Sequence, residues 1–191
     1  TGPGHEAVER MIQASAGDTP QQRRNAAMLE TLFFLGLRSN ELCSCDLKDL
    51  ELDGDDKPKV WIMGKGHKQS VRLTMPKRIA EAIRLWLAVR GTEPGPAFNS
   101  FDRNGLLTMR RLRTCSVNWL VKKIAKAAGV PRNVWTHALR HAAITRVLDL
   151  NNGDVRAAQR FSRHKSMDMV MIYDDNRRDL QGQMANLLAG E

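Results

Sequence analysis

Residues 136–174 read THALRHAAITRVLDLNNGDVRAAQRFSRHKSMDMVMIYD. This stretch contains four side chains suited to chemistry on a phosphate, namely His137, Arg140, His164 and Tyr173. His137 and Arg140 are three positions apart in a helical pattern, so they project from one face and can hold one phosphate. Tyr173 is the single tyrosine of the chain and is the candidate nucleophile. We expect the rest of the chain to be organised around this stretch.

Each of these signals has an ordinary structural explanation. A lone tyrosine is usually part of a core or of a hydrogen-bonded scaffold, and a His-x-x-Arg pair on a helix is usually a solvated face. Their joint occurrence in this order favours chemistry instead. His164 follows Arg140 by 24 positions (164 minus 140), and Tyr173 follows His164 by 9 (173 minus 164).

Composition and charge narrow the class of protein. The chain has 191 residues, 42% of them hydrophobic, which is enough for the core of one domain. It has neither an apolar run long enough to cross a membrane nor a charged-then-apolar leader, so we expect a cytoplasmic protein with no membrane partner. The net charge of +9 favours a nucleic-acid partner, because neutralised phosphates release condensed counterions. The basic residues fall in several patches, as a protein that wraps a duplex requires: 23–24, 65–68, 110–113, 122–126 and 177–178.

The cysteines do not indicate a metal centre or a disulfide framework. Cys43, Cys45 and Cys115 are an odd number and form no CxxC pair, so buried or inert thiols are the simpler explanation. We expect no metal and no cofactor.

Hydrophobic periodicity predicts an α+β fold that is mainly α. Three short strands joined by polar turns between Asp46 and Met75 predict a small three-stranded antiparallel sheet at one edge. Thr19 and Pro20 are placed to cap and begin a helix that ends at Gly36. The remaining expected helices lie in residues 1–15, 76–89, about 108–129, 136–150, 155–161, 166–172 and 177–188.

Two segments upstream of residue 136 also carry charged groups suited to a phosphate. Arg38 follows a helix end, Ser39 is the expected cap of the next helix, and Glu41 is placed to hold the arginine; a local salt bridge is the plain alternative. The tip GKGHK of residues 64–68 places Lys65 in a hairpin, where a flexible solvated turn is the plain alternative.

Together these residues resemble the catalytic motif of the tyrosine recombinases, the phage-integrase family. The first arginine of that family lies in a Leu-Arg-x-x-Glu-Leu segment similar to residues 37–42, and a hairpin lysine follows it, as Lys65 does here. The resemblance implies a catalytic set supported by Glu41: Arg38, Lys65, His137, Arg140, His164 and Tyr173.

The resemblance also implies the role of each residue. Arg38 and Arg140 donate to the non-bridging phosphate oxygens, His137 helps to take the tyrosine proton, and His164 adds a hydrogen bond to the phosphate. Lys65 protonates the leaving 5′ oxygen. The product is a 3′-phosphotyrosyl enzyme, and a second DNA hydroxyl can reverse the attack. DNA-backbone contacts are expected from Lys68, Arg110, Arg111 and Arg163.

The family pattern sets further expectations. Arg163 stands where the family commonly has glycine. Too few residues precede Arg10 for the family's N-terminal DNA-binding domain, so residues 1–191 are expected to be the catalytic half of a longer protein. The helix within 177–191 is expected to pack on an adjacent protomer.

The expected activity is recombination of double-stranded DNA by an integrase of a phage or other mobile element, acting as a dimer on each site and a tetramer in synapsis. Two alternatives remain. One is a type IB topoisomerase-like enzyme that relaxes supercoils, and the other is a basic module that binds DNA without cutting it.

Overall fold

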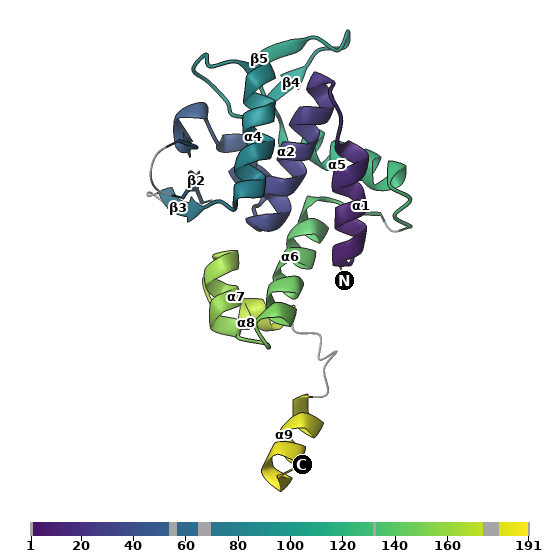
Figure 1. The fold of residues 1–191 in the computed structure, drawn as a ribbon, viewed down its shortest axis with the longest axis vertical. Coiled ribbons are helices and arrows are strands. Elements are labelled where there is room, and N and C mark those ends of the chain that lie inside the picture. Colours follow the sequence, from purple (N-terminus) through teal and green to yellow (C-terminus); the bar gives the residue numbers. More distant parts are fainter. Residues whose placement is uncertain (1, 54–56, 65–69, 132, 174–179, 191) are drawn as a thin grey trace. The chain divides into compact units, whose positions relative to one another are not determined.

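The computed structural model describes residues 2–53, 57–64, 70–131, 133–173 and 180–190. The chain divides into two compact units, unit 1 (Thr1–Ala143) and unit 2 (Ile144–Glu191) (Figure 1). The division falls inside one helix, α6 (Thr136–Leu150). Each unit is described separately below.

Unit 1 is built from helices whose ends agree with local sequence signals. Thr19 caps α2 by accepting a hydrogen bond from the backbone N–H of Gln22, and the Gln22 side chain accepts from the backbone N–H of Thr19; Pro20 is the first helical residue. Gly36 takes the left-handed conformation just after the helix, with φ of 54°. The predicted cap and end of this helix are therefore confirmed. The helices before α6 are α1 (His5–Ser15), α2 (Pro20–Phe34), α3 (Ser39–Ser44), α4 (Lys77–Arg90) and α5 (Thr114–Ala127).

The core of unit 1 lies between these helices. α2 packs along α4, while α1 packs on α2 and α5 (Figure 1). Met28 and Leu32 of α2, and Ile79 and Trp86 of α4, have no exposed surface. The Trp86 indole N–H donates to the backbone carbonyl of Ala97 at 2.8 Å, which satisfies the one polar group of that buried ring.

A three-stranded antiparallel sheet follows α3, as the sequence predicts. A 3₁₀ turn at Leu47–Asp49 leads into the strands, and alternate residues of the central strand, Val60 and Ile62, are buried. The strand order is β1 (Leu50–Glu51), β2 (Lys59–Met63), β3 (Ser70–Thr74).

A second, two-stranded sheet corrects the sequence-based prediction. The helix expected from about Thr108 begins only at Thr114, because β5 (Leu107–Arg111) pairs with β4 (Asn99–Phe101). The Asp102 carboxylate accepts the backbone N–H groups of Asn104 and Leu106 in the connecting turn. This Asp-Arg-Asn-Gly turn at 102–105 is a hairpin signal that the basic run after it concealed.

Unit 2 contains the C-terminal half of α6 and, within its described residues, three further helices. A small apolar cluster joins Ile144 and Leu148 of α6 to Ala158, Val170 and Tyr173. The helices that follow α6 are α7 (Val155–Ser162), α8 (Asp168–Met171) and α9 (Leu180–Ala189). Helices and small antiparallel sheets together give the mainly α, α+β fold that the sequence predicts.

Candidate active site

Arg38 is held by the buried carboxylate of Glu41. One carboxylate oxygen accepts from the Arg38 backbone N–H at 2.9 Å, and the other accepts from Nη1 of its guanidinium at 2.9 Å. Glu41 is 1% exposed, whereas the Arg38 side chain is 36% exposed. Arg38 itself is the N-cap of α3, so the predicted Ser39 cap is wrong: the carboxylate at the third helical position satisfies the cap and makes a serine there unnecessary.

Arg140 is brought to the same region by the turn after α2. Its guanidinium, 2% exposed, donates from Nη1 to the backbone carbonyl of Gly36, two positions before Arg38. A pocket of about 210 Å³ results, and its lining comes from α3 and the first turns of α6: Arg38, Ser39, Asn40, Thr136, His137 and Arg140. The prediction that His137 and Arg140 face one pocket is confirmed, and Arg38 shares that pocket.

The start of α6 is fixed by α5. The Asn118 carboxamide oxygen accepts the Thr136 backbone N–H at 3.2 Å and the Thr136 hydroxyl at 2.6 Å. One of the unpaired N–H groups of the helix end is thereby satisfied by a side chain. Because His137 is the next residue, this contact positions its imidazole, which is exposed at the pocket. Sequence reasoning missed Asn118, and nothing in the sequence pairs it with Thr136.

The charge and size of the pocket suit a phosphate. Two guanidinium groups line it, and the one carboxylate beside Arg38 already accepts two hydrogen bonds. Guanidinium forks match phosphate oxygens in geometry and stay charged at any ordinary pH. The imidazole of His137 adds a group that can donate or accept a proton. This arrangement can bind a phosphodiester and stabilise added negative charge on it.

His164 and Tyr173 form a second group, within unit 2. Their rings stack with centroids 5.6 Å apart and an interplanar angle of 22°. Tyr173 is 7% exposed and packs in the apolar cluster with Val170, and its backbone N–H donates to the Val170 carbonyl at 2.9 Å. The structure thus places the predicted nucleophile directly beside the second predicted histidine.

Arg163 has the backbone conformation that favours glycine. It ends α7 with φ of 59° and ψ of 37°, in the left-handed region. Glycine, which commonly occupies this position in the family, adopts that conformation without strain, and Arg163 adopts it in spite of its side chain. The Arg163 guanidinium donates to the Phe161 carbonyl at 2.9 Å. The arginine therefore ends the helix and also places a positive charge in the residue next to His164.

The predicted DNA-contact residues differ in their surroundings. Lys65 and Lys68 lie outside the described residues. Arg110 is exposed on β5. Arg111 instead donates to the backbone carbonyls of Cys43 and Cys45, at 2.7 and 3.4 Å, and to the Asp46 carboxylate at 2.5 Å. Arg111 therefore caps the C-terminal end of α3, the helix whose N-cap is Arg38.

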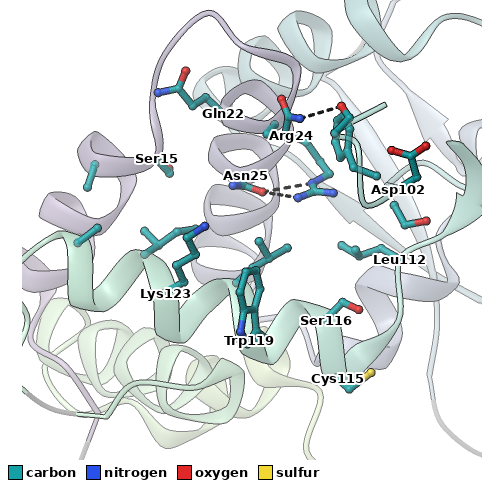
Figure 2. A pocket seen from close by; sticks show the side chains of 18 of the residues that line it. Ser15, Gln22, Arg24, Asn25, Asp102, Leu112, Cys115, Ser116, Trp119 and Lys123 are labelled. Atoms are coloured by element: carbon teal, nitrogen blue, oxygen red, sulfur yellow. Dashed lines mark hydrogen bonds between the residues drawn. The ribbon is translucent and has the colours of Figure 1, made fainter. Parts of the chain in front are cut away.

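One residue of the predicted basic patch at 23–24 lies in the protein interior. Arg24 is 5% exposed, donates to the Asn25 side chain and the Asn99 carbonyl, and stacks on the Phe101 ring at 4.7 Å. Desolvation lowers its pKa to about 10. Figure 2 shows Arg24 and Asn25, joined by hydrogen bonds, at the wall of a cavity of about 860 Å³, together with Trp119 and Lys123. Among the predicted catalytic residues of unit 1 that the structure describes, Arg38, His137 and Arg140 do not line that cavity.

The thiols of Cys43 and Cys45 are buried and resist ionisation to the reactive thiolate. Burial raises the pKa of Cys43 to about 11 and that of Cys45 to about 12, while Cys115 is exposed. Within the described ranges, no three His, Cys, Asp or Glu side chains are grouped so as to hold a metal ion. Over the same ranges, the helices are too short or too polar to span a bilayer.

Comparison with known proteins tests the resemblance. The family model described as the phage integrase family matches residues 4–179. The chain belongs to the phage integrase family. Its curated relatives include the tyrosine recombinase slr0733 of Synechocystis, 30% identical over 191 residues, which cover 99% of this chain and 59% of that protein. The tyrosine recombinase XerC of Corynebacterium glutamicum is 35% identical over 170 residues, covering 88% of this chain and 52% of that one.

Two solved structures share the fold of this chain. XerA recombinase superposes with a TM-score of 0.75 at 24% identity, over 99% of this chain and 63% of that chain. A lambda integrase dimer bound to a COC′ core site superposes with a TM-score of 0.67 at 17% identity. The match covers 94% of this chain and 49% of that chain. The predicted family and fold are therefore confirmed. The chain spans between about half and two thirds of the lengths of these four proteins.

Proposed function

We propose that this chain is the catalytic domain of a site-specific DNA recombinase that cuts and rejoins strands through a 3′-phosphotyrosyl link. The observation that carries the proposal is the pocket where Arg38, His137 and Arg140 meet, because those three side chains suit a phosphodiester. Membership of the phage integrase family and relatives named tyrosine recombinases support the same activity.

In the proposed first step, the Tyr173 hydroxyl oxygen attacks the phosphorus of a phosphodiester held by Arg38 and Arg140. The P–O5′ bond breaks as the bond from tyrosine to phosphorus forms. His137 accepts the phenolic proton and Lys65 protonates the departing 5′ oxygen. The guanidinium groups stabilise the charge that develops on the non-bridging oxygens, and His164 donates a further hydrogen bond to them.

Rejoining reverses the same step. A 5′-hydroxyl from another strand attacks the phosphotyrosine, the bond to Tyr173 breaks, and the tyrosine recovers its proton. Because the covalent link preserves the phosphodiester free energy, no nucleotide cofactor or metal is needed in this scheme. The proposed substrate is double-stranded DNA, and the proposed setting is the cytoplasm, with an integrase of a phage or other mobile element as the biological context. XerH bound to its difH substrate and lambda integrase bound to a core site, both similar in fold, support a DNA substrate.

The test is capture of the covalent intermediate. A pool of duplexes with a randomised centre and a nick releases a short 5′-hydroxyl fragment on cleavage, which traps the adduct. We expect a protein–DNA band on a denaturing gel for the unaltered chain and none for Tyr173→Phe, which removes only the hydroxyl. Binding in a native gel is expected to stay within about threefold, because the lost group makes no ground-state phosphate contact.

Other outcomes distinguish the alternatives. An undiminished adduct in Tyr173→Phe would remove Tyr173 as nucleophile. Binding without any adduct supports the non-catalytic module, and relaxation of supercoils without strand exchange supports the topoisomerase-like activity.

Assembly on DNA is a further part of the proposal: a dimer on each site, a tetramer in synapsis, and the C-terminal segment 177–191 exchanged between protomers. Three apolar side chains of α9 are largely exposed, Met184 at 52%, Leu187 at 67% and Leu188 at 91%. Deleting residues 177–191 is expected to leave the thermal transition nearly unchanged and to abolish the slow-migrating synaptic complex. If the deletion abolished most of the thermal transition, and the protein that stayed folded still formed the synaptic complex, the helix would belong to the core of its own chain.

A further inference from the structure

The last turn of α7 ends beside His164 and contacts one specific nitrogen of its ring. The Ser162 side chain has no exposed surface, and its Oγ lies 2.9 Å from His164 Nδ1. The same Oγ donates to the backbone carbonyl of Gln159, one turn earlier, at 3.3 Å. Ser162 thus connects the imidazole to the backbone of α7. This serine was not among the residues singled out by the sequence.

The hydrogen count of the hydroxyl decides the direction of both bonds. A serine hydroxyl has one hydrogen and two lone pairs. If the hydrogen goes to the Gln159 carbonyl, a lone pair of Oγ remains for an N–H on His164 Nδ1, and both bonds form. If the hydrogen goes to Nδ1, the bond to Gln159 is lost. In a buried site the arrangement that makes both bonds is favoured, since leaving a buried polar group without its hydrogen bond is unfavourable.

We propose that Ser162 is a positioning residue that holds His164 with its hydrogen on Nδ1, so that Nε2 is the ring nitrogen used in the reaction. The neutral ring then has an acceptor at Nε2, and His164 donates to a phosphate oxygen only as the imidazolium. This inference rests on the proposed function for its meaning in catalysis. The position of the hydrogen is a property of unit 2 alone.

Neighbouring contacts limit rotation of the imidazole. The Gln159 carboxamide donates to the His164 backbone carbonyl at 3.2 Å, and the Gln159 backbone carbonyl also accepts the Arg163 N–H at 2.8 Å. The His164 ring stacks on Tyr173. A 180° flip of the ring about its Cβ–Cγ bond would exchange Nδ1 with Cδ2 and so break the bond to Ser162. The contacts therefore hold Nδ1 toward Ser162.

Nitrogen NMR of the histidine rings tests the proposal without DNA. The chain is labelled with ¹⁵N-histidine, and His164→Gln identifies the signals of His164 among those of the five histidines. Spectra are recorded at a pH where the ring is neutral. We expect a protonated Nδ1 and an unprotonated Nε2 in the unaltered chain. In Ser162→Ala we expect a shift toward the tautomer protonated at Nε2, because the acceptor for Nδ1–H is gone. Ser166→Ala, a half-buried serine of the same unit, is the control and should leave the signals unchanged.

Cleavage of the nicked duplex pool gives the second measurement. Ser162→Ala is expected to lower the rate about tenfold, the low end of losses when an orienting partner of a functional histidine is removed from metal sites; Ser166→Ala should cleave at the unaltered rate. A neutral His164 protonated at Nε2 in the unaltered chain overturns the proposal, as does a tautomer that Ser162→Ala does not change. The NMR result is independent of cleavage, so a chain that never forms an adduct but shows this tautomer contradicts the proposed function alone.

Discussion

The arginine pocket of unit 1 and the histidine–tyrosine pair of unit 2 are held by different kinds of contact. The Arg140 guanidinium reaches the Gly36 carbonyl across 104 positions of sequence, and Thr136 reaches Asn118 across 18. In unit 2, the partners of His164 that hold its ring and backbone lie two and five positions away, at Ser162 and Gln159.

This difference has consequences for mutation. The pocket of unit 1 exists only when α2, α3, α5 and α6 are packed, so changes there act through tertiary structure. The surroundings of His164 depend on the last turn of one short helix, so changes there act through local backbone and hydrogen bonds. Loss of function in unit 1 must therefore be separated from loss of folding, and the following experiments do so.

Among variants that keep the proposed nucleophile, the largest expected effect is that of Arg140→Ala. Removing one donor that stabilises charge in a transition state costs about 10²–10³ in rate, so adduct formation should fall by at least that factor. Arg24→Ala is the matched control, because Arg24 is an equally buried arginine of unit 1 that lies outside the pocket. Both variants should lower Tm, but Arg24→Ala should cleave at nearly the unaltered rate when assayed below its Tm. Cleavage by folded Arg140→Ala within tenfold of the unaltered chain would remove Arg140 from the phosphate site.

The sequence predicts the polar residues of the site better than the contacts that bring these residues together. His137 and Arg140 are three apart on one helix, and Arg38 and Glu41 are three apart at a helix start, so their pairing follows from helical geometry. That Arg38 and Arg140 share a pocket does not follow from any local pattern, because it depends on the bond to the Gly36 carbonyl. The family resemblance supplied that link.

The errors in the prediction have a common physical cause. The sequence predicts a helix from Thr108 because basic residues at 110–113 continue the polar face of α5, but pairing with β4 outweighs this weak local preference. The bonds of Arg111 to the carbonyls of α3 are likewise absent from the prediction, because a charged side chain in a sequence does not reveal the backbone groups that it meets. Ser162 was missed because a serine at a helix end is common.

The next effect concerns the proposed general acid. Lys65→Ala is expected to cleave ordinary DNA slowly but to recover most of its rate on DNA with sulfur at the 5′-bridging position, because a thiolate leaves without a proton. Lys68→Ala is the matched control, with a smaller loss and no selective recovery. Recovery by Lys68→Ala alone would transfer the role to Lys68. If neither variant recovered, this hairpin would contribute no general acid.

A smaller effect is expected where the chain start packs on α6. A Cβ added to Gly2 would lie 2.5 Å from the Ala138 carbonyl oxygen and 2.8 Å from the Ala142 nitrogen, both backbone atoms, whereas one added to Gly4 meets nothing within 4 Å. Overpacking of this kind costs about 1–3 kcal/mol. Gly2→Ala should therefore lower Tm and slow cleavage by displacing the helix of His137 and Arg140, while Gly4→Ala should do neither. Equal behaviour of the two variants would show that the start of the chain does not support α6.

The smallest effect, and the only stabilising one, is expected in unit 2. Arg163 and Asn152 both have φ of 59°. The left-handed conformation costs about 1–2 kcal/mol for most residues, but asparagine tolerates it better. Arg163→Gly should relieve this backbone strain and so stabilise the fold. The substitution also removes the bond to the Phe161 carbonyl and increases the conformational freedom of the unfolded chain, and both effects offset part of that stabilisation. The net expectation is about 0.5–1 kcal/mol of added stability, with less from Asn152→Gly.

Denaturant unfolding measures the change in the free energy of unfolding of Arg163→Gly. DNA binding at several salt concentrations measures the change in its DNA affinity. If Arg163 contacts a phosphate, as its charge next to His164 leads us to expect, Arg163→Gly should weaken binding and reduce the slope of log K against log salt by about 1. Asn152→Gly should leave that slope unchanged. A variant that becomes more stable and binds DNA as before would mean that the arginine at this position serves neither the turn nor the DNA. A variant that loses stability would show that its bond to the Phe161 carbonyl outweighs the left-handed strain, and the local backbone of unit 2 would then depend on its side chains more than on its conformation.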